Sequence, residues 1–334
     1  MSEDNEDNEE NEENIVRSTE KGGRLKSFVT SPFGLCVTAL FCCMLWGSAF
    51  SGVKVGYKAL SMDSSDWAGQ MVFAGIRFFI AGLMAIAAGS ISRRKLLLPT
   101  KSSIPKIGII SFFQTIAQYF FYYIGLAHTT GVKAAVIVAA NVFAAILISA
   151  LLFKMEKLTL RKITGCVIGF GGIILINIGG LGGQSFNLLG DGFIFLCTIA
   201  SGFSSAFMKK LSGGEDPVML SGYQFMFGGA VMWLFGAVCG GKIGGFTLFS
   251  AGMLIYLAFV SAAAYSLWAV LLKFNPVSKV AVYGLMNPVC GVIISAIVLD
   301  EGGAFGVKGV CALAMVCIGI YIVNRNGSNE RKNS

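Results

Sequence analysis

This sequence of 334 residues has few charged side chains, one histidine and six prolines. Charged residues make up 13% of the chain and apolar residues 55%, whereas soluble domains average about 25% charged. The apolar excess is too large for the core of one soluble domain. A lipid bilayer accommodates it, because each membrane-spanning helix needs roughly 20 mostly apolar residues. The composition therefore predicts an integral membrane protein.

The single histidine and the scattered cysteines disfavour a metal site. Nine cysteines lie singly in apolar stretches, except for the adjacent pair Cys42 and Cys43, and no C-x-x-C spacing occurs. Zinc sites need clustered Cys and His ligands, so we interpret the cysteines as buried free thiols. We expect no metal and no cofactor. Without a nucleophile or metal constellation, we do not expect an enzyme.

The net charge of +8 hides two oppositely charged parts of the chain. Eight acidic and no basic residues lie within the first fourteen positions, which leaves 26 basic against 10 acidic residues elsewhere. An acidic, Asn-rich segment cannot bury a core, so residues 1–30 are expected to form a disordered tail. The basic surplus is typical of membrane-protein loops, and we expect no nucleic acid partner.

Ten apolar segments follow this tail, and the connections between them are too short for a soluble domain. The first is too long for a cleavable signal peptide and lacks an A-x-A-like end, so we expect it to remain as a helix. The predicted fold is all-α integral membrane, with ten transmembrane helices. The segments cover approximately residues 33–57, 68–91, 105–127, 131–153, 160–179, 188–208, 218–240, 248–272, 276–299 and 304–323.

The basic residues predict the orientation of these helices. With the amino terminus in the cytoplasm, the inner segments hold 20 Lys and Arg residues and the outer segments hold 5, while Arg77 lies within a helix. An odd number of helices would place the basic tail at 325–334 outside. We therefore expect a multi-pass protein of the cell (cytoplasmic) membrane with both termini in the cytoplasm.

An internal repeat relates the two halves of the chain. Most of the matched residues share one offset, given at the end of this paragraph. A shorter match near the start of each half has a different offset and aligns Ser48-Ala49-Phe50 with Ser205-Ala206-Phe207. The repeats are predicted at 31–180 and 186–324, with five helices each. Because five is odd, the second repeat enters the membrane from the opposite side, as in many secondary transporters. At an offset of 146 residues the aligned pairs are Ala117 and Ala263, Tyr119 and Tyr265, Tyr122 and Trp268, Lys133 and Lys279, Asn141 and Asn287, and Ser149 and Ser295.

Several motifs in this order resemble one family over roughly residues 33–324. They are Trp46-Gly47-Ser48-Ala49-Phe50, Arg77-Phe78, Glu156 ahead of Gly165, and the run from Asn287-Pro288-Val289 to Leu299-Asp300-Glu301. Together they resemble the drug/metabolite transporter superfamily, specifically its EamA-type members with ten helices. The resemblance implies a carrier that moves small organic solutes, commonly outward, through a central cavity between its halves.

One departure from the family pattern concerns the fourth helix. The family typically carries a proline where this chain has Asn141-Val142, and the proline is kept only in the second half, as Pro288. We therefore expect any contribution of a helix break to gating to be asymmetric.

Polar residues inside the predicted helices are the candidate site residues, because such groups are expensive in hydrocarbon. Arg77 either binds an anionic substrate or bonds to carbonyls or an acid at a helix junction. The family has an arginine here across varied substrates, so we assign Arg77 the structural role. Pro288 is assigned a structural or gating role as well.

The third helix carries a polar stripe. Gln114, Gln118 and Tyr122 recur every four residues, on about one face of a helix, and their repeat counterparts are mostly apolar. This stripe either lines a cavity with one polar and one apolar wall, or joins helices by hydrogen bonds.

Two asparagines and three aromatic residues complete the predicted cavity, with Ser48 beside them. Asn141 and Asn287 occupy equivalent positions in mid-helix. The aromatic residues can pack against substrate, including a cation over a ring, or can belong to the core or an interfacial belt. The acids at the helix ends, and His128, are candidates for proton uptake or are merely interfacial. The aromatic residues are Trp46, Tyr265 and Trp268, and the acids are Glu156, Asp300 and Glu301.

The sequence is compatible with two functions. The first is a secondary transporter that exports amino-acid-like or amine-like solutes by alternating access. The second is a membrane scaffold or accessory subunit with the same fold and no transport activity. The expected partners are a small-molecule substrate and the lipid bilayer, and association as a homodimer is left open.

The orientation can be tested by cysteine labelling. Gln184 lies between the fifth and sixth apolar segments, so Gln184→Cys should react with an impermeant maleimide in intact cells, beyond the labelling of the unsubstituted chain. Labelling only after permeabilisation would contradict the predicted orientation.

Overall fold

The computed structural model describes residues 23–63, 65–129, 131–177, 186–298 and 307–325. Within these ranges the chain forms ten helical spans and no strand, which confirms the predicted fold class. Six of the described spans are long and apolar enough to cross a membrane by length and composition alone. Most of the acidic tail, Gln184, and the pair Asp300 and Glu301 lie outside the described residues.

We number the spans 1 to 10 in chain order. The second half consists of span 6 (η4, Leu188–Gly192, with α9, Phe193–Leu211), span 7 (α10, Pro217–Val238), span 8 (α11, Leu248–Phe274), span 9 (α12, Val277–Ala281, η5, Val282–Leu285, and α13, Met286–Val298) and span 10 (α14, Val307–Asn324). The first half consists of span 1 (α2, Pro32–Ala59), span 2 (α3, Trp67–Arg93), span 3 (α4, Ser103–Ser111, η1, Phe112–Ala117, and α5, Gln118–Ala127), span 4 (α6, Gly131–Ala139, α7, Asn141–Leu147, and η2, Ile148–Leu152) and span 5 (α8, Leu160–Asn177).

Short polar residues define where several spans begin. The side chains of Ser31 and Asp66 accept hydrogen bonds from the backbone amides three residues later, at the starts of α2 and α3. Asp216 does the same for α10, with Pro217 as its first residue, and Thr247 forms a capping box at α11. These caps satisfy amides that have no partner within the helix.

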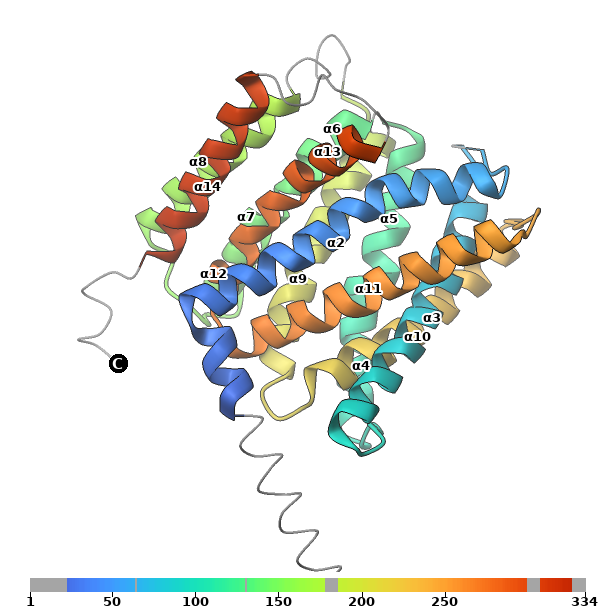
Figure 1. The fold of residues 1–334 in the computed structure, drawn as a ribbon, viewed down its shortest axis with the longest axis horizontal. Helices are drawn as coiled ribbons and strands as arrows, with labels where there is room; N and C mark the ends of the chain where they lie inside the picture. The colour runs from blue at the N-terminus through green and yellow to red at the C-terminus, as the bar shows by residue number, and fades with distance from the viewer. Residues whose placement is uncertain (1–22, 64, 130, 178–185, 299–306, 326–334) are drawn as a thin grey trace, which may run out of the picture.

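The two halves interlock. Equivalent helices pair across the structure: α3 packs against α10, and α8 packs against α14 at the opposite edge of the bundle (Figure 1). Span 1 packs against spans 8 and 9 of the other half, and span 6 packs against spans 3 and 4. Each half therefore completes its packing with helices from the other.

Glycines let the paired helices approach closely. A Cβ atom on Gly75 would lie 2.7 Å from the carbonyl oxygen of Gly229, and one on Gly82 would lie 2.5 Å from that of Gly222. The order of these contacts shows that α3 and α10 run antiparallel. Gly165 and Gly319 make the corresponding close contact between α8 and α14, as small residues do between membrane helices.

The contacts of span 1 and of its counterpart, span 6, show that the Ser-Ala-Phe match aligns these two helices in the wrong register. A Cβ on Gly47 would lie 2.8 Å from that of Cys290, and a Cβ on Gly202 would lie 2.9 Å from that of Ala144. Ala144 and Cys290 are equivalent at the offset of 146. Gly47 therefore corresponds to Gly202, two residues away from the register that the Ser-Ala-Phe match predicts.

Spans 4 and 9 are both interrupted at their equivalent midpoints. In span 9 the 3₁₀ segment η5 ends just before Asn287-Pro288, as expected where proline removes a helical hydrogen bond. Span 4 has no proline, yet it breaks at Ala140, between α6 and α7. An interruption is therefore present in both halves although only span 9 has a proline: the residue after the break in span 4 is Asn141, and asparagine disfavours a helix interior.

Gly229→Ala tests the close packing of α3 and α10. The new Cβ would lie 2.6 Å from the backbone nitrogen of Phe79, so we expect the free energy of unfolding to fall by about 1–3 kcal/mol, as overpacking does. The measurement is the thermal unfolding midpoint in one detergent. Gly252→Ala is the control, because that Cβ would meet nothing within 4 Å, and alanine there should stabilise α11. Equal effects at both positions would contradict this account.

Candidate functional site

The contact between the two halves is centred on residues that the repeat relates to each other. The hydroxyls of Tyr119 and Tyr265, equivalent at the offset of 146, lie 2.8 Å apart. Phe78 and Phe225 stack with ring centroids 5.1 Å apart and planes 2° from parallel. Equivalent residues of an inverted repeat can touch only near the pseudo-two-fold axis. These two pairs therefore locate that axis.

Two tryptophans extend this contact into one cluster. The ring of Trp46, in span 1, lies 5.0 Å from both Tyr265 and Trp268, in span 8. Its indole nitrogen is buried and has no hydrogen-bond partner among the described residues. The structure thus brings together the three predicted aromatic residues. We call the whole group the axial aromatic cluster: Trp46, Phe78, Tyr119, Phe225, Tyr265 and Trp268.

Arg77 borders this cluster and is only 5% exposed. Its guanidinium carbon lies 4.4 Å from the centroid of the Phe78 ring, and Tyr57, Tyr119, Tyr123 and Tyr265 are its electrostatic neighbours. The expected carbonyl or acidic partner is not found in the described part of the chain, and Nε is buried without a hydrogen bond. An unpaired buried charge costs several kcal/mol, and the contact with the face of the Phe78 ring offsets part of that cost.

The polar stripe of span 3 is rearranged by a π-helical segment. Gln118 is next to Tyr265, and the ring of Tyr122 lies 6.3 Å from that of Tyr119, so both border the cluster. Gln114 lies within the π-helical segment η1, whose wider turn moves it out of simple four-residue register with the other two. Gln114 is buried and its Oε1 atom has no partner among the described residues.

The two predicted asparagines lie at the breaks of spans 4 and 9. The Oδ1 atom of Asn141 would lie 3.9 Å from a Cβ on Gly284, in η5. The Oδ1 atom of Asn287 is buried and unpaired within the described residues. Ser48 is placed differently: its hydroxyl donates to the Leu45 carbonyl and accepts from Tyr256, an exposed residue of span 8.

Several residues of this site were not predicted from the sequence. Tyr57, Phe78, Tyr119 and Phe225 were not selected, although Tyr119 belongs to an aligned repeat pair. The useful signal was the pairing itself, because Arg77-Phe78 aligns with Gln224-Phe225 at an offset of 147. Because a residue on the axis meets its own repeat counterpart, aligned aromatic pairs in the sequence predict the residues of this contact.

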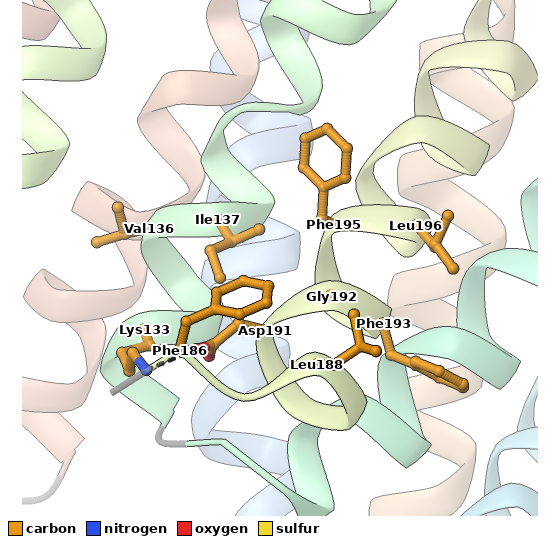
Figure 2. Close-up of a pocket in the computed structure, with 10 residues that line it drawn as sticks. All are labelled: Lys133, Val136, Ile137, Phe186, Leu188, Asp191, Gly192, Phe193, Phe195 and Leu196. Atoms are coloured by element: carbon orange, nitrogen blue, oxygen red, sulfur yellow. Dashed lines mark hydrogen bonds and ion pairs between the residues drawn. The ribbon is translucent and has the colours of Figure 1, made fainter. Parts of the chain in front are cut away.

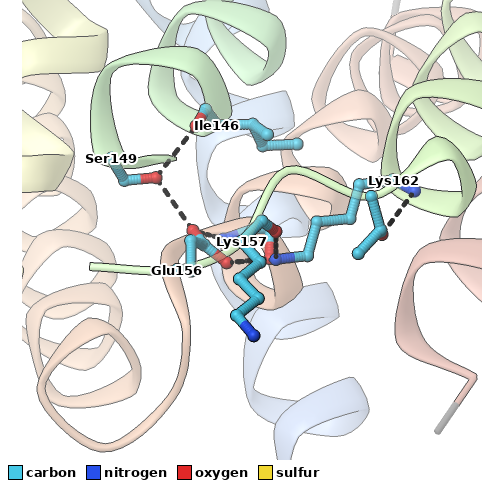
Figure 3. Close-up of polar contacts among 7 residues, drawn as sticks. Ile146, Ser149, Glu156, Lys157 and Lys162 are labelled. Carbon is cyan, nitrogen blue, oxygen red and sulfur yellow. Dashed lines mark hydrogen bonds and ion pairs between the residues drawn. The ribbon is translucent and has the colours of Figure 1, made fainter. Parts of the chain in front are cut away.

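Glu156 joins the halves at the predicted cytoplasmic end. It follows span 4 and accepts hydrogen bonds from Ser149 (2.8 Å) and Lys162 (2.8 Å) (Figure 3). The backbone amide of Ser278 (2.9 Å) and the Ser278 hydroxyl also donate to it. Ser278 lies in the first turn of α12, so Glu156 caps span 9. Burial raises the pKa of Glu156, but the bonds from Lys162, Ser278 and Ser149 outweigh burial, and the pKa lies below its usual value.

A second acid on this side, Glu215, links spans 6 and 7 to span 3. Its carboxylate accepts from Lys106 (2.7 Å) and Ser103 (2.9 Å). The hydrogen bond from Lys106 is the main reason that the pKa of Glu215 is lowered. Both acids therefore remain ionised near neutral pH, which disfavours them as proton carriers.

The opposite end has an ion pair of its own. Lys133, at the start of span 4, lies 2.6 Å from Asp191, at the start of span 6, and Thr129 also donates to Asp191. The pair borders a cleft of about 810 Å³ that is lined mainly by apolar side chains (Figure 2). Phe186, Leu188 and Phe195 in its lining are more than half exposed, as expected of a lipid-facing surface. None of the predicted cavity residues lines this cleft.

Comparisons with known proteins agree with this architecture. The model of the family described as the EamA-like transporter family matches residues 33–178 and 188–325. A protein of Archaeoglobus fulgidus named an uncharacterized transporter is 26% identical over 84% of this chain and 95% of its own length. A protein of Escherichia coli K12 named a probable amino-acid metabolite efflux pump is 26% identical over 79% and 87%. One crystal structure, 16% identical, has the same fold, with a TM-score of 0.73 over 91% of this chain and all of the other.

Glu156→Gln tests the tie that Glu156 makes between the two halves. Because the pKa of Glu156 is lowered in the folded protein, its ionised form stabilises the fold above the ordinary glutamate pKa of 4.5, and this contribution is lost as the pH falls through the folded pKa. At pH 7 the substitution should lower the free energy of unfolding by about 1.5–3 kcal/mol. Thermal unfolding from pH 7 to pH 3.5 should show the difference from wild type shrinking. A difference that is constant across this range would contradict the assignment.

Proposed function

The chain belongs to the EamA-like transporter family, and from this premise we propose that it exports small organic metabolites, amino-acid-like or amine-like, by alternating access. The name of the Escherichia coli relative supports the choice of solute. The observation that carries the proposal is the axial aromatic cluster, where buried unpaired polar atoms adjoin aromatic rings at the contact between the two halves. The proposed setting is the cytoplasmic membrane, with both termini in the cytoplasm.

The proposed substrate site is formed by the cluster and its polar border. The rings of Trp46, Tyr265 and Trp268 would pack against the apolar body of the solute. Gln118 and Tyr122 would supply hydrogen bonds on one side, and Asn141 and Asn287 on another. Unpaired groups of this kind are tolerated in a membrane protein where they face a ligand or water, which supports a binding role for Asn287 and for the Trp46 indole.

The proposed motion is a rocking of one half against the other around the axis. Its support is that polar ties join the halves at both ends: Glu156 with Ser278 on one side, and Lys133 with Asp191 on the other. The interrupted spans 4 and 9 lie between these ties and provide bending points at mid-depth. An alternating carrier has to release one end while it holds the other, and separate ties at the two ends are suited to that.

Reconstituted protein tests transport directly. In proteoliposomes, counterflow of a panel of amino acids, amines and nucleosides should reveal at least one transported solute. Tyr265→Phe removes a hydroxyl from the axial pair and should lower the initial rate at low substrate concentration about 3- to 10-fold, since one hydrogen bond contributes about 0.5–1.5 kcal/mol.

The matched control is Tyr321→Phe, which alters an exposed tyrosine on α14 and should leave the rate unchanged. Flux of no solute in the panel by correctly folded protein would favour the scaffold alternative. An unchanged rate in Tyr265→Phe would remove the axial pair from the site.

A further inference from the structure

We infer that the transported solute carries a carboxylate and that Arg77 binds it. The inference rests on the proposed function, because it specifies the chemistry of the same site. It changes the role of Arg77 from a structural group to the residue that selects the substrate class. It also narrows the proposed solutes, because amines without an acidic group are excluded.

The first support is the burial of Arg77 without a hydrogen-bonding partner or counter-ion among the described residues; the face of the Phe78 ring, 4.4 Å from the guanidinium carbon, offsets only part of the cost of burying the charge. The residue is 95% buried, yet none of its nitrogens has a hydrogen bond or ion pair with the described residues, and Nε is fully enclosed. Arginine stays protonated in proteins. A permanent charge held in this way needs an anion, and a carboxylate fits the planar guanidinium with two parallel hydrogen bonds.

The second support is the absence of an internal anion in the described part of the chain. Every acidic residue described there lies in a connection or at the end of a span, never near mid-span. The electrostatic neighbours of the guanidinium are instead the hydroxyl-bearing rings of Tyr57, Tyr119, Tyr123 and Tyr265. The described acids are Asp63, Asp66, Glu156, Asp191, Glu215 and Asp216.

The surrounding hydroxyls strengthen the case for an anion. Tyr57 has a buried hydroxyl that makes no hydrogen bond of normal geometry with the described residues, although the Tyr123 hydroxyl lies close to it, so its proton is available to a carboxylate beside Arg77. A cationic amine would instead meet an uncompensated positive charge at low dielectric, which opposes binding. The site therefore favours an anionic group over an ammonium group.

The repeat gives the site a direction. The counterpart of Arg77 is Gln224, a neutral and fully buried side chain whose Oε1 accepts a hydrogen bond from Thr115 (2.7 Å). The two halves thus place a charge in span 2 and a neutral amide at the equivalent position of span 7. A solute with a carboxylate at one end and an apolar body against Trp46 and Trp268 matches this arrangement.

Matched ligand series test the inference on the wild-type protein in lipid nanodiscs. Each series contains an amino acid, the same compound without its amino group, and the same compound without its carboxyl group: L-phenylalanine, 3-phenylpropanoate and phenylethylamine, with parallel sets built on leucine and glutamine. Binding is measured by calorimetry and transport by counterflow. We expect both carboxylates of at least one series to bind at least 10-fold more tightly than its amine. Equal or tighter binding of the amines would overturn the inference.

Variants then assign the selectivity to Arg77. Arg77→Gln should lower carboxylate affinity at least 10-fold and bring the ratio of carboxylate to amine affinity close to one, and Arg77→Lys should restore part of the ratio. Arg161→Gln is the matched control, because Arg161 is exposed and bonds to the carbonyl of Arg325. A purely structural arginine would reduce the affinity for all ligands together and leave the ratio unchanged, which would overturn the assignment.

A milder variant covers the case in which Arg77→Gln does not fold. Tyr57→Phe removes only this hydroxyl and should reduce carboxylate affinity a few-fold with no effect on amines; no change in carboxylate affinity would count against the inference. The transport proposal and the inference about Arg77 are contradicted by different results. If no solute of any class crosses the membrane, transport itself fails. If amines or nucleosides cross and carboxylates do not, transport stands and the inference about Arg77 is overturned.

Discussion

The cost of an unpaired polar group in hydrocarbon is the constraint on which this structure depends. Helices satisfy the backbone internally, and short capping side chains such as Asp66 and Asp216 complete the helix ends where the chain returns to water. Most of the charged side chains stay in the connections. Against this background, the buried atoms of Trp46, Arg77 and Asn287 that have no hydrogen-bond partner in the described part of the chain stand out, because they occur where the two halves meet.

The inverted repeat explains why they occur there. A repeat of five helices places its second copy upside down, so the contact between copies is the one place where a residue meets its own counterpart. Tyr119 with Tyr265 and Phe78 with Phe225 are such contacts. The symmetry relates equivalent positions of the two halves, and departures from it provide chemistry: the counterpart of Arg77 is the neutral Gln224, so only one half contributes a charge at this position.

The ends of the molecule are organised differently from its centre. Glu156 and Glu215 on one side, and Asp191 on the other, are fully engaged by lysines, hydroxyls or backbone amides. This engagement lowers the pKa of both glutamates, so they act as fixed anions that hold connections in place. The exposed apolar side chains around the ion pair of Lys133 and Asp191 belong with the lipid-facing surface.

The sequence by itself determined the number of spans, the inverted repeat and the family, because these depend on apolar length, charge and aligned motifs, all of which are local or periodic. It also brought Trp46, Tyr265 and Trp268 forward as site residues. It failed where interactions between distant segments decide. The break in span 4 needs no proline, the π-helical turn moves Gln114 out of line with Gln118, and the absence of a described partner for Arg77 is visible only when all neighbouring helices are in place. Only the tertiary structure decided these points, because whether a buried polar group is satisfied depends on every helix packed around it.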